Sequence, residues 1–173
     1  MPIRSERLDL LELSEEALER IIAEDAPGLA SVLGVEVPEP WLAAVQAEEN
    51  HKIIQADPAA TPWLSRGIVL RSARRLVGEV GFHQPPDDLA VVELGYEVLP
   101  EYRRQGIAAE AIRALTGWAH STGRADTVYV TIERRNEASI GLVRSLGFRF
   151  DEDYDDPVDG PIVFYESALP LPG

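Results

Sequence analysis

One short segment combines two cations with a glycine turn, and it reads Arg103-Arg104-Gln105-Gly106-Ile107-Ala108. It has the form Arg/Gln-x-x-Gly-x-Gly/Ala and stands between an expected strand and an expected helix. The first turn of a helix leaves backbone N–H groups unpaired and carries about half a positive charge. Gly106 lets the backbone approach an anion, and the two arginines add charge beside it. The segment predicts a phosphate cradle, against the alternative of an ordinary strand-to-helix turn.

The residue types that the chain lacks exclude other chemistries. It has no cysteine, which excludes a disulfide framework, a thiolate metal site and a cysteine nucleophile. Its histidines, His51, His83 and His120, show no metal-ligand spacing, so no metal site is expected. No apolar run reaches the length of a membrane span, and the first residues lack the apolar core of a secretory signal. We expect a cytoplasmic protein.

The charge is unevenly distributed along the chain. The net charge is −14, from 16 Lys and Arg against 30 Asp and Glu. Residues 100–149 hold eight arginines and five acids, a net of +3, and the remainder carries −17. A chain this acidic is a poor candidate for binding nucleic acid through phosphates, and cationic small partners fit it better. The basic region indicates an anionic ligand, against the alternative of solvated helix faces.

Apolar patterning predicts the elements that must position the cradle. Strands are expected over 7–13, 67–70, 76–82, 89–99 and 127–132, with final strands from Phe148. Helices are expected after the N-cap Ser14 as far as Pro27-Gly28, after Pro40 as far as Asp57-Pro58, over 105–121, and after the N-cap Asn136. This order of elements indicates an α/β or α+β fold in a single domain over residues 1–173.

Three linked segments of the chain resemble the Gcn5-related N-acetyltransferase (GNAT) superfamily, and within it the RimJ/RimL-type branch. They read VGEVGFH, ELGYEVLPEYRRQGIAAEAIRAL and NEASIGLVRSLGFR, in the family's order and at about its spacing. The resemblance implies a GNAT fold with a mixed central sheet of six to seven strands and about four helices. It also implies acetyl-CoA as cosubstrate, with residues 103–108 on the pyrophosphate and the backbone of Val98 and Leu99 on the pantetheine arm.

The same resemblance suggests which residue takes the proton from an amine. Glu93 matches the family position where a glutamate often serves as general base. The alternative is that it pairs with an arginine across the sheet. Glu97 is the reserve candidate, on the same face of the strand if no bulge intervenes.

The family's usual acid is missing from this chain. The superfamily often has a tyrosine on the last helix that protonates the departing thiolate, and the matching position here is Val143. Ser139, one turn earlier, is the expected donor instead, against the alternative that it bonds the carbonyl four residues before. A thiol has a pKa near 8.5, so a thiolate leaves without full protonation. Asn136 resembles an asparagine that contacts the cofactor arm, and it is also a good N-cap.

An acidic run follows the third segment, with six acids among residues 151–159. We interpret it as a connection near the acceptor side that attracts a cationic amine, against the alternative of a solvated loop.

These observations predict an acetyl-CoA-dependent N-acetyltransferase that transfers the acetyl group directly to a primary amine. The branch favours the N-terminal α-amine of a protein or peptide. Two alternatives stay open: an enzyme that acetylates polyamines or aminoglycosides, and an acyl-CoA sensor without turnover. An unrelated phosphate-binding domain would require three ordered segments to match by chance. No nucleic acid or membrane partner is expected, and a homodimer is open.

Overall fold

The computed structural model describes residues 2–43, 45, 47–157 and 160–172. The chain groups into two compact units, which are described one at a time. The first comprises Met1–Pro85 and Gly95–Leu115, and the second comprises Pro86–Leu94 and Thr116–Gly173. Strand β5 and helix α5 each run from one unit into the other.

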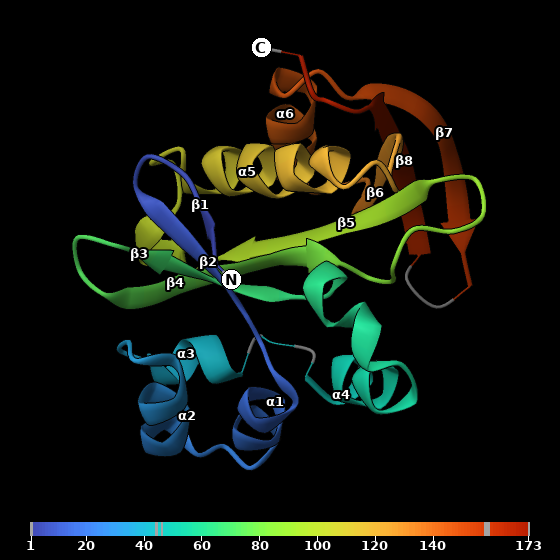
Figure 1. Cartoon of the computed structure of the whole chain (residues 1–173). Helices are drawn as coiled ribbons and strands as arrows, with labels where there is room; N and C mark the ends of the chain where they lie inside the picture. The colour runs from blue at the N-terminus through green and yellow to red at the C-terminus, as the bar shows by residue number, and fades with distance from the viewer. Residues whose placement is uncertain (1, 44, 46, 158–159, 173) are drawn as a thin grey trace. The chain divides into compact units, whose positions relative to one another are not determined.

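The first unit contains an antiparallel sheet (Figure 1). Its strands are β1 (Ile3–Arg4), β2 (Leu8–Glu12), β3 (Arg66–Leu70), β4 (Arg75–Phe82) and the second half of β5 (Val91–Val98). The strands stand in chain order, and β4 lies beside β5. A Cβ at Gly78 would come within 2.3 Å of the Glu97 carbonyl oxygen, so glycine is needed for this close approach.

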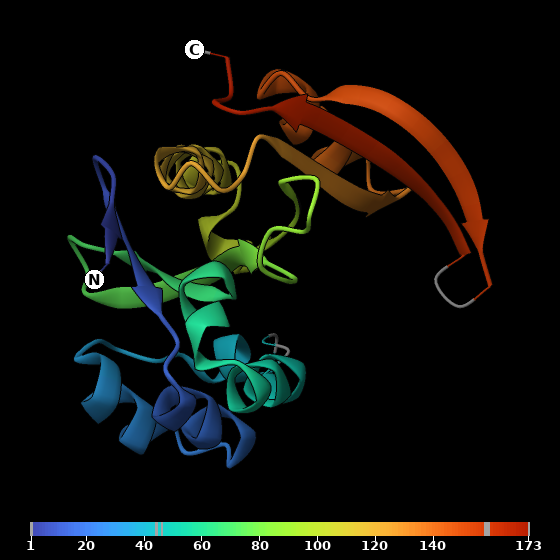
Figure 2. The same ribbon diagram turned by 45° about the vertical axis from the view of Figure 1, so that its right-hand side comes forward.

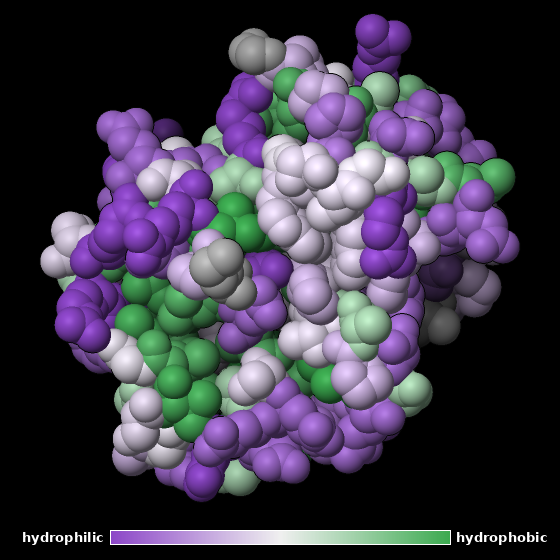
Figure 3. Space-filling view, viewed as in Figure 1, coloured by the Kyte–Doolittle hydropathy of each residue, from purple (hydrophilic) through white to green (hydrophobic). Residues whose placement is uncertain are grey.

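Helices cover both faces of this sheet. They are α1 (Glu15–Ile22), α2 (Ala26–Leu33), α3 (Glu39–Leu42), α4 (Ala47–Ala56), the short 3-10 helices η1 (Pro58–Trp63) and η2 (Pro100–Tyr102), and the first turns of α5 (Ile107–Ser121). Figures 1 and 2 show α1–α4 on one face and the beginning of α5 on the other. The core under α1–α4 includes Leu18, Leu29 and Trp41. Figure 3 shows hydrophobic surface over α2 and α3, where Leu33 and Leu42 are partly buried.

The helical part of this unit corrects two expectations. Pro27 does not end a helix but stands in the first turn of α2, a position that tolerates proline because its N–H would be unpaired in any case. Pro40 likewise lies inside the first turn of α3. The single helix expected between Pro40 and Asp57 is therefore wrong, since α3 and α4 are separate helices.

The second unit is built on a mixed arrangement of strands. The first half of β5 pairs in parallel with β6 (Thr127–Glu133) over Val91–Glu93. Strand β6 pairs antiparallel with β8 (Gly160–Ala168), which pairs with β7 (Arg149–Asp156), giving the order β5-β6-β8-β7. Figure 2 shows β7 and β8 as a long curved hairpin. Helix α6 (Glu137–Ser145) follows β6, and Gly147 with φ +93° stands just beyond its end.

Alternation along β5 and β6 separates an apolar face from a polar one. Val128, Val130 and Ile132 of β6 are buried, as are Val92 and Leu94 of β5. The residues between them point to the opposite side of the strands, because successive side chains alternate. Glu93, Tyr129 and Thr131 therefore share one face.

The structure confirms the mixed α/β class and the GNAT-type fold. The described residues form eight strands and six α-helices, more than expected, because β1 and the division of the early helical region were missed.

The acidic run is not a loop: residues 151–156 belong to β7, and residues 158–159 lie outside the described part. Within the described residues, no helix is long and apolar enough to cross a membrane. A single domain remains a prediction.

Candidate functional site

The segment before α5 has the backbone of an anion cradle. Strand β5 ends at Val98, η2 turns the chain, and α5 begins at Ile107. Arg104 has φ +60° and Gly106 has φ +77°. Left-handed residues placed between ordinary ones turn successive N–H groups toward one side, which makes a concave donor surface for anions. The helix N-terminus adds its positive end. The backbone geometry of this segment can therefore accommodate a phosphate.

The side chains of the cradle have divided roles. Arg104 is exposed and has no hydrogen-bond or ion-pair partner among the described residues, so its charge is available to a ligand. The Arg103 Nε donates to the Val98 carbonyl at 2.8 Å, and its Nη2 lies 3.6 Å from Glu97. The Gln105 amide donates to the Glu101 carbonyl. Ile107 is buried and Ala108 is half-buried at the start of α5.

The backbone of Val98 and Leu99 is partly engaged within the first unit. The Leu99 N–H donates to the Val77 carbonyl at 2.9 Å, and its carbonyl accepts from the Tyr102 N–H. The Val98 carbonyl accepts from Arg103. A pantetheine arm bound to the Val98 carbonyl must therefore share that oxygen with the guanidinium of Arg103.

A second charged pair lies against the cradle and was missed by the sequence analysis. The Arg7 Nε donates to Glu110 Oε2 at 2.7 Å, and the Arg7 Nη1 donates to the Gln105 carbonyl at 3.0 Å. Burial alone would raise the pKa of Glu110, but hydrogen bonds from Ser5 and Arg7 outweigh it and lower the pKa below its ordinary value. No local signal could identify Arg7, because its partners lie about a hundred residues along the chain.

In the second unit, Glu93 is held by two hydroxyl groups. The Tyr129 hydroxyl donates to Glu93 Oε2 at 3.0 Å, and the Thr131 hydroxyl donates to Glu93 Oε1 at 2.9 Å. Hydrogen bonds to the charged form favour an ionised carboxylate. Burial, aided by the charge of Glu93, raises the pKa of Tyr129 to about 12, so its phenol keeps the proton that it donates.

The residues expected on the last helix show distinct roles. Asn136 is the N-cap of α6, since its side chain accepts from the Ser139 N–H at 3.1 Å. The Ser139 hydroxyl is half-buried and has no hydrogen-bond partner among the described residues, so it does not bond the carbonyl four residues before. Val143, at the position of the family tyrosine, is fully buried and packs in the core.

A buried carboxylate in the first unit was also missed. Glu79 lies on β4 close to Glu97 and His83, and its Oε2 is buried without a hydrogen-bond partner. Burial raises the pKa of Glu79 to about 7, the charge of Glu97 adds to this, and His83 opposes it. One acid in the otherwise apolar VGEVGF is the sequence signal that could have identified it. Such a carboxyl exchanges its proton near neutral pH.

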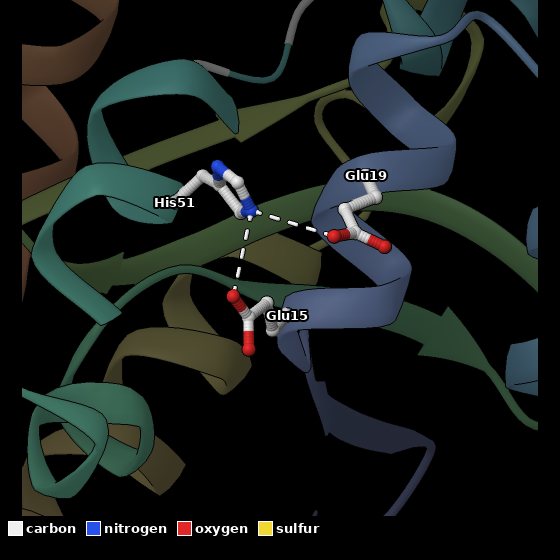
Figure 4. A group of neighbouring side chains, drawn as sticks. All are labelled: Glu15, Glu19 and His51. Carbon is white, nitrogen blue, oxygen red and sulfur yellow. Dashed lines mark ion pairs between the residues drawn. The ribbon is translucent and has the colours of Figure 1, made fainter. Parts of the chain in front are cut away.

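One group of neighbouring acids and histidine lies elsewhere in the first unit (Figure 4). The His51 Nε2 is 3.8 Å from Glu15 Oε1 and 3.9 Å from Glu19 Oε1. Within the described part of the chain, this is the one group of three such side chains close enough to hold a metal ion. The sequence analysis did not anticipate this grouping. Both glutamates are half-exposed or more, and the two distances place His51 of α4 beside α1, where an ion pair forms when the histidine is protonated.

A surface pocket of about 470 Å³ opens in the second unit at the end of β6. It is lined by Glu133, Arg134, Arg135 and Pro161. Arg134 forms an ion pair with Asp153 of β7 at 2.7 Å, and Arg135 forms one with Glu133. One acid of β7, Asp153, is therefore paired with an arginine from the turn that follows β6.

The predicted residues fall into two groups. The cradle residues 103–108, Val98 and Leu99 lie together in the first unit, whereas Glu93, Asn136 and Ser139 lie in the second. Strand β5 connects the groups along the chain, since it carries Glu93 and leads to the cradle. The first group can bind an anion, and the second offers a carboxylate and a hydroxyl for proton transfer.

Comparison with known proteins connects these features to a family. The model of the acetyltransferase (GNAT) domain matches residues 7–149. A protein of Bacillus subtilis strain 168, an uncharacterized N-acetyltransferase called YoaA, is 26% identical over 148 residues, which are 85% of this chain and 82% of that protein.

Solved structures share the fold at low identity. An acetyl transferase from Salmonella typhimurium that modifies the N-terminal serine of the ribosomal protein L7/L12 superposes with a TM-score of 0.69, at 15% identity, over 98% of this chain and 99% of that one. A ribosomal L7/L12 alpha-N-protein acetyltransferase, RimL, in complex with coenzyme A gives a TM-score of 0.68 at 15% identity, over 98% of both chains. At this identity the likeness concerns the fold alone.

Proposed function

Because this chain belongs to the GNAT acetyltransferase family, we propose that it transfers the acetyl group of acetyl-CoA to the α-amine at the N-terminus of a protein or peptide. The chain is an N-acetyltransferase with acetyl-CoA as its cosubstrate. The observation that carries the proposal is the cradle before α5, where the left-handed residues Arg104 and Gly106 precede a helix N-terminus and Arg104 has no partner among the described residues.

The cradle fits the pyrophosphate of coenzyme A. Gly106 stands at φ +77°, where a side chain would be strained, and the exposed Arg104 matches the negative charge of a phosphate. Val98 and Leu99, which lead into the cradle, are the residues for the pantetheine arm. When bound, acetyl-CoA supplies an acetyl group activated as a thioester.

Glu93 is the proposed base. In the transfer, the amine nitrogen forms a bond to the acetyl carbon, the carbon–sulfur bond breaks, and the thiolate of coenzyme A leaves. Glu93 accepts the amine proton directly or through one water, and the hydroxyls of Tyr129 and Thr131 keep its carboxylate oriented. Ser139, whose hydroxyl has no hydrogen-bond partner in the described part of the chain, donates a hydrogen bond to the departing sulfur in place of the missing tyrosine.

Two considerations favour an α-amine over a lysine as acceptor. Deprotonation at pH 7 costs about 1 kcal/mol for an α-amine and about 4.6 kcal/mol for a lysine, so one carboxylate base suffices more readily for the former. The Salmonella typhimurium protein with the same fold modifies an N-terminal serine. Both support a protein or peptide N-terminus.

Release of free thiol from acetyl-CoA tests the proposal without background, because the chain has no cysteine. Peptides with a free N-terminus are compared with N-terminally blocked lysine peptides, polyamines and aminoglycosides. We expect release with the free N-termini and little with blocked peptides. Release with a polyamine or aminoglycoside alone would replace the proposed acceptor. Tight binding of coenzyme A without release in any arm would favour an acyl-CoA sensor.

A further inference from the structure

The Arg7 side chain reaches the cradle from the other end of the chain. Arg7 stands immediately before β2, and its Nη1 donates to the Gln105 carbonyl at 3.0 Å. Its Nη2 lies 3.4 Å from the position that a Cβ on Gly106 would take. The guanidinium therefore lies directly against the peptide that joins Gln105 to Gly106.

Arg7 is itself held in place by Glu110. The Arg7 Nε donates to Glu110 Oε2 at 2.7 Å, and the Arg7 backbone N–H donates to Glu110 Oε1 at 2.7 Å. Glu110 also accepts from the Ser5 hydroxyl at 2.6 Å, and its side chain is only 17% exposed. The Arg7 carbonyl accepts from the Arg71 N–H. Charge-assisted bonds of this kind fix both the position and the plane of a guanidinium.

Because the peptide bond is planar, the contact between Arg7 and the Gln105 carbonyl also sets the direction of the Gly106 N–H. In a trans peptide the carbonyl and the following N–H point in opposite directions. Because Arg7 holds the Gln105 carbonyl, the Gly106 N–H points away from Arg7. Gly106, at φ +77°, has no side chain to restrict rotation of this peptide, so an outside contact is needed to fix it.

The Arg7–Glu110 pair contributes geometry to the cradle and little net charge. Its two opposite charges lie 2.7 Å apart and largely cancel for a ligand beyond them. The attractive charge comes instead from Arg104, which has no partner among the described residues. Arg7 therefore orients the loop, whereas Arg104 supplies the charge that attracts the ligand.

We propose that Arg7 is a positioning residue for coenzyme A: held by Glu110, it fixes the Gln105–Gly106 peptide so that the Gly106 N–H faces the pyrophosphate. The inference rests on the proposed function, because it takes the cradle to bind acetyl-CoA. A fixed N–H donor loses less conformational freedom when it binds than a rotating one, so the affinity for the diphosphate increases.

The test compares ligands with and without the pyrophosphate. In Arg7→Met, we expect coenzyme A to bind about tenfold more weakly by calorimetry, with a similar rise in the KM for acetyl-CoA and an unchanged kcat. S-acetylpantetheine carries the same thioester without the phosphates, and its kcat/KM is expected to stay within about twofold. Equal losses for both thioesters, or unchanged binding of coenzyme A, would overturn the proposal.

A matched control and a conservative variant separate position from charge. Arg20 is 45% exposed against 44% for Arg7 and also pairs with a carboxylate, Asp25, at 3.0 Å. Arg20→Met removes the same charge away from the cradle, and coenzyme A binding is expected not to change. Arg7→Lys keeps the charge but cannot bridge Glu110 and Gln105 together, so we expect no rescue. Full rescue by lysine would show that charge alone matters.

A milder variant and a binding measurement keep the proposal testable when Arg7→Met folds poorly or when no acceptor is found. If Arg7→Met folds poorly, Ser5→Ala loosens Glu110 with less disturbance, and it should weaken coenzyme A about threefold with the same sparing of pantetheine compounds. Calorimetry with coenzyme A needs no acceptor amine. If no amine is acetylated, the proposed function fails, while the effect of Arg7→Met on coenzyme A binding can still be observed. If Arg7→Met leaves coenzyme A binding unchanged, the role proposed for Arg7 fails, while the proposed function can still be confirmed by thiol release.

Discussion

Two carboxylates on neighbouring strands of the chain differ in their hydrogen bonds. In the first unit, Glu79 on β4 is buried, one of its oxygens has no donor, and its pKa is raised to about 7. In the second unit, both oxygens of Glu93 on β5 accept hydrogen bonds, from Tyr129 and Thr131. Burial alone drives a carboxyl toward its neutral form, whereas hydrogen-bond donors around a carboxylate favour its charged form.

The carboxyl groups of Glu79 and Glu93 therefore suit different chemical tasks. A carboxylate that stays ionised and oriented is ready to accept a proton from an amine, which is the task proposed for Glu93. A carboxyl that titrates near neutrality links folding to pH, because its proton occupancy differs between the folded and unfolded chain.

The largest effect is expected from Glu93→Gln. An amide cannot accept the amine proton, so kcat/KM should fall by about 10²- to 10⁴-fold while coenzyme A binding is preserved. Steady-state thiol release with a free N-terminal peptide measures this change. Glu97→Gln is the matched control on the same strand, and we expect it to retain most of the activity. A large loss in Glu97→Gln with an active Glu93→Gln would transfer the role of base to Glu97.

Glu79→Gln should change stability in a pH-dependent way. The folded-state pKa of about 7 lies above the ordinary value of 4.5, so the contribution of Glu79 to stability is complete below pH 4.5 and is lost as the pH rises through 7. Glutamine does not titrate, so the variant does not lose this stability. Its free energy of unfolding should exceed that of the natural chain between pH 5 and 9, by at most about 3 kcal/mol. Urea unfolding at several pH values measures the difference.

Glu49→Gln provides the control for Glu79→Gln. Glu49 is 65% exposed on α4 and pairs with Lys52, so its substitution should give a difference that barely depends on pH. A stability difference for Glu79→Gln that is equally flat would contradict the assigned environment of Glu79.

Thr131→Val makes the surroundings of Glu93 more like those of Glu79. It removes the donor to Glu93 Oε1 and keeps the shape of the side chain. Because the lost hydrogen bond favoured the ionised carboxylate, the acid limb of the kcat/KM profile should move to higher pH. Thr127→Val, on the same face of β6, serves as control. An unmoved limb in Thr131→Val would mean that Glu93 is not the group that titrates in catalysis.

The smallest effect is expected from Ser139→Ala. The hydroxyl of Ser139 helps a thiolate that can leave without full protonation, so the loss of kcat should be less than tenfold. The helix should be preserved, because Asn136 caps it through the Ser139 backbone N–H and not through its hydroxyl. Thiol release together with thermal unfolding separates the two contributions. A drop of a hundredfold or more would make Ser139 an essential acid.

Elements with strong periodicity and clear caps could be predicted from the sequence. The strand before the cradle, helix α5, β6 and the helix capped by Asn136 are all present where the patterning indicated them. Each has an apolar stripe or alternation together with a boundary residue, so local propensity and tertiary packing agree. The turn at residues 103–108 was predicted from the same boundary signals, because glycine readily takes the positive φ that Gly106 has before the helix.

The missed features depend on contacts between distant residues. Arg7 and Glu110 lie more than a hundred positions apart, and no local pattern connects them. The state of Glu79 depends on what covers it, and its own strand does not reveal this. The acids of residues 151–156 were taken for a loop because charge is typical of loops, but pairing with β8 makes them a strand. Tertiary context decided each case.

Strand β7 stands at the end of the strand order, so one of its sides has no strand partner among the described residues. Such an edge is a template on which a second chain could add by backbone pairing. Five of its eight residues are acidic, and two copies aligned edge to edge would place like charges opposite each other. The same acids that were first considered as an attraction for substrate therefore oppose backbone pairing between two copies of the chain along β7.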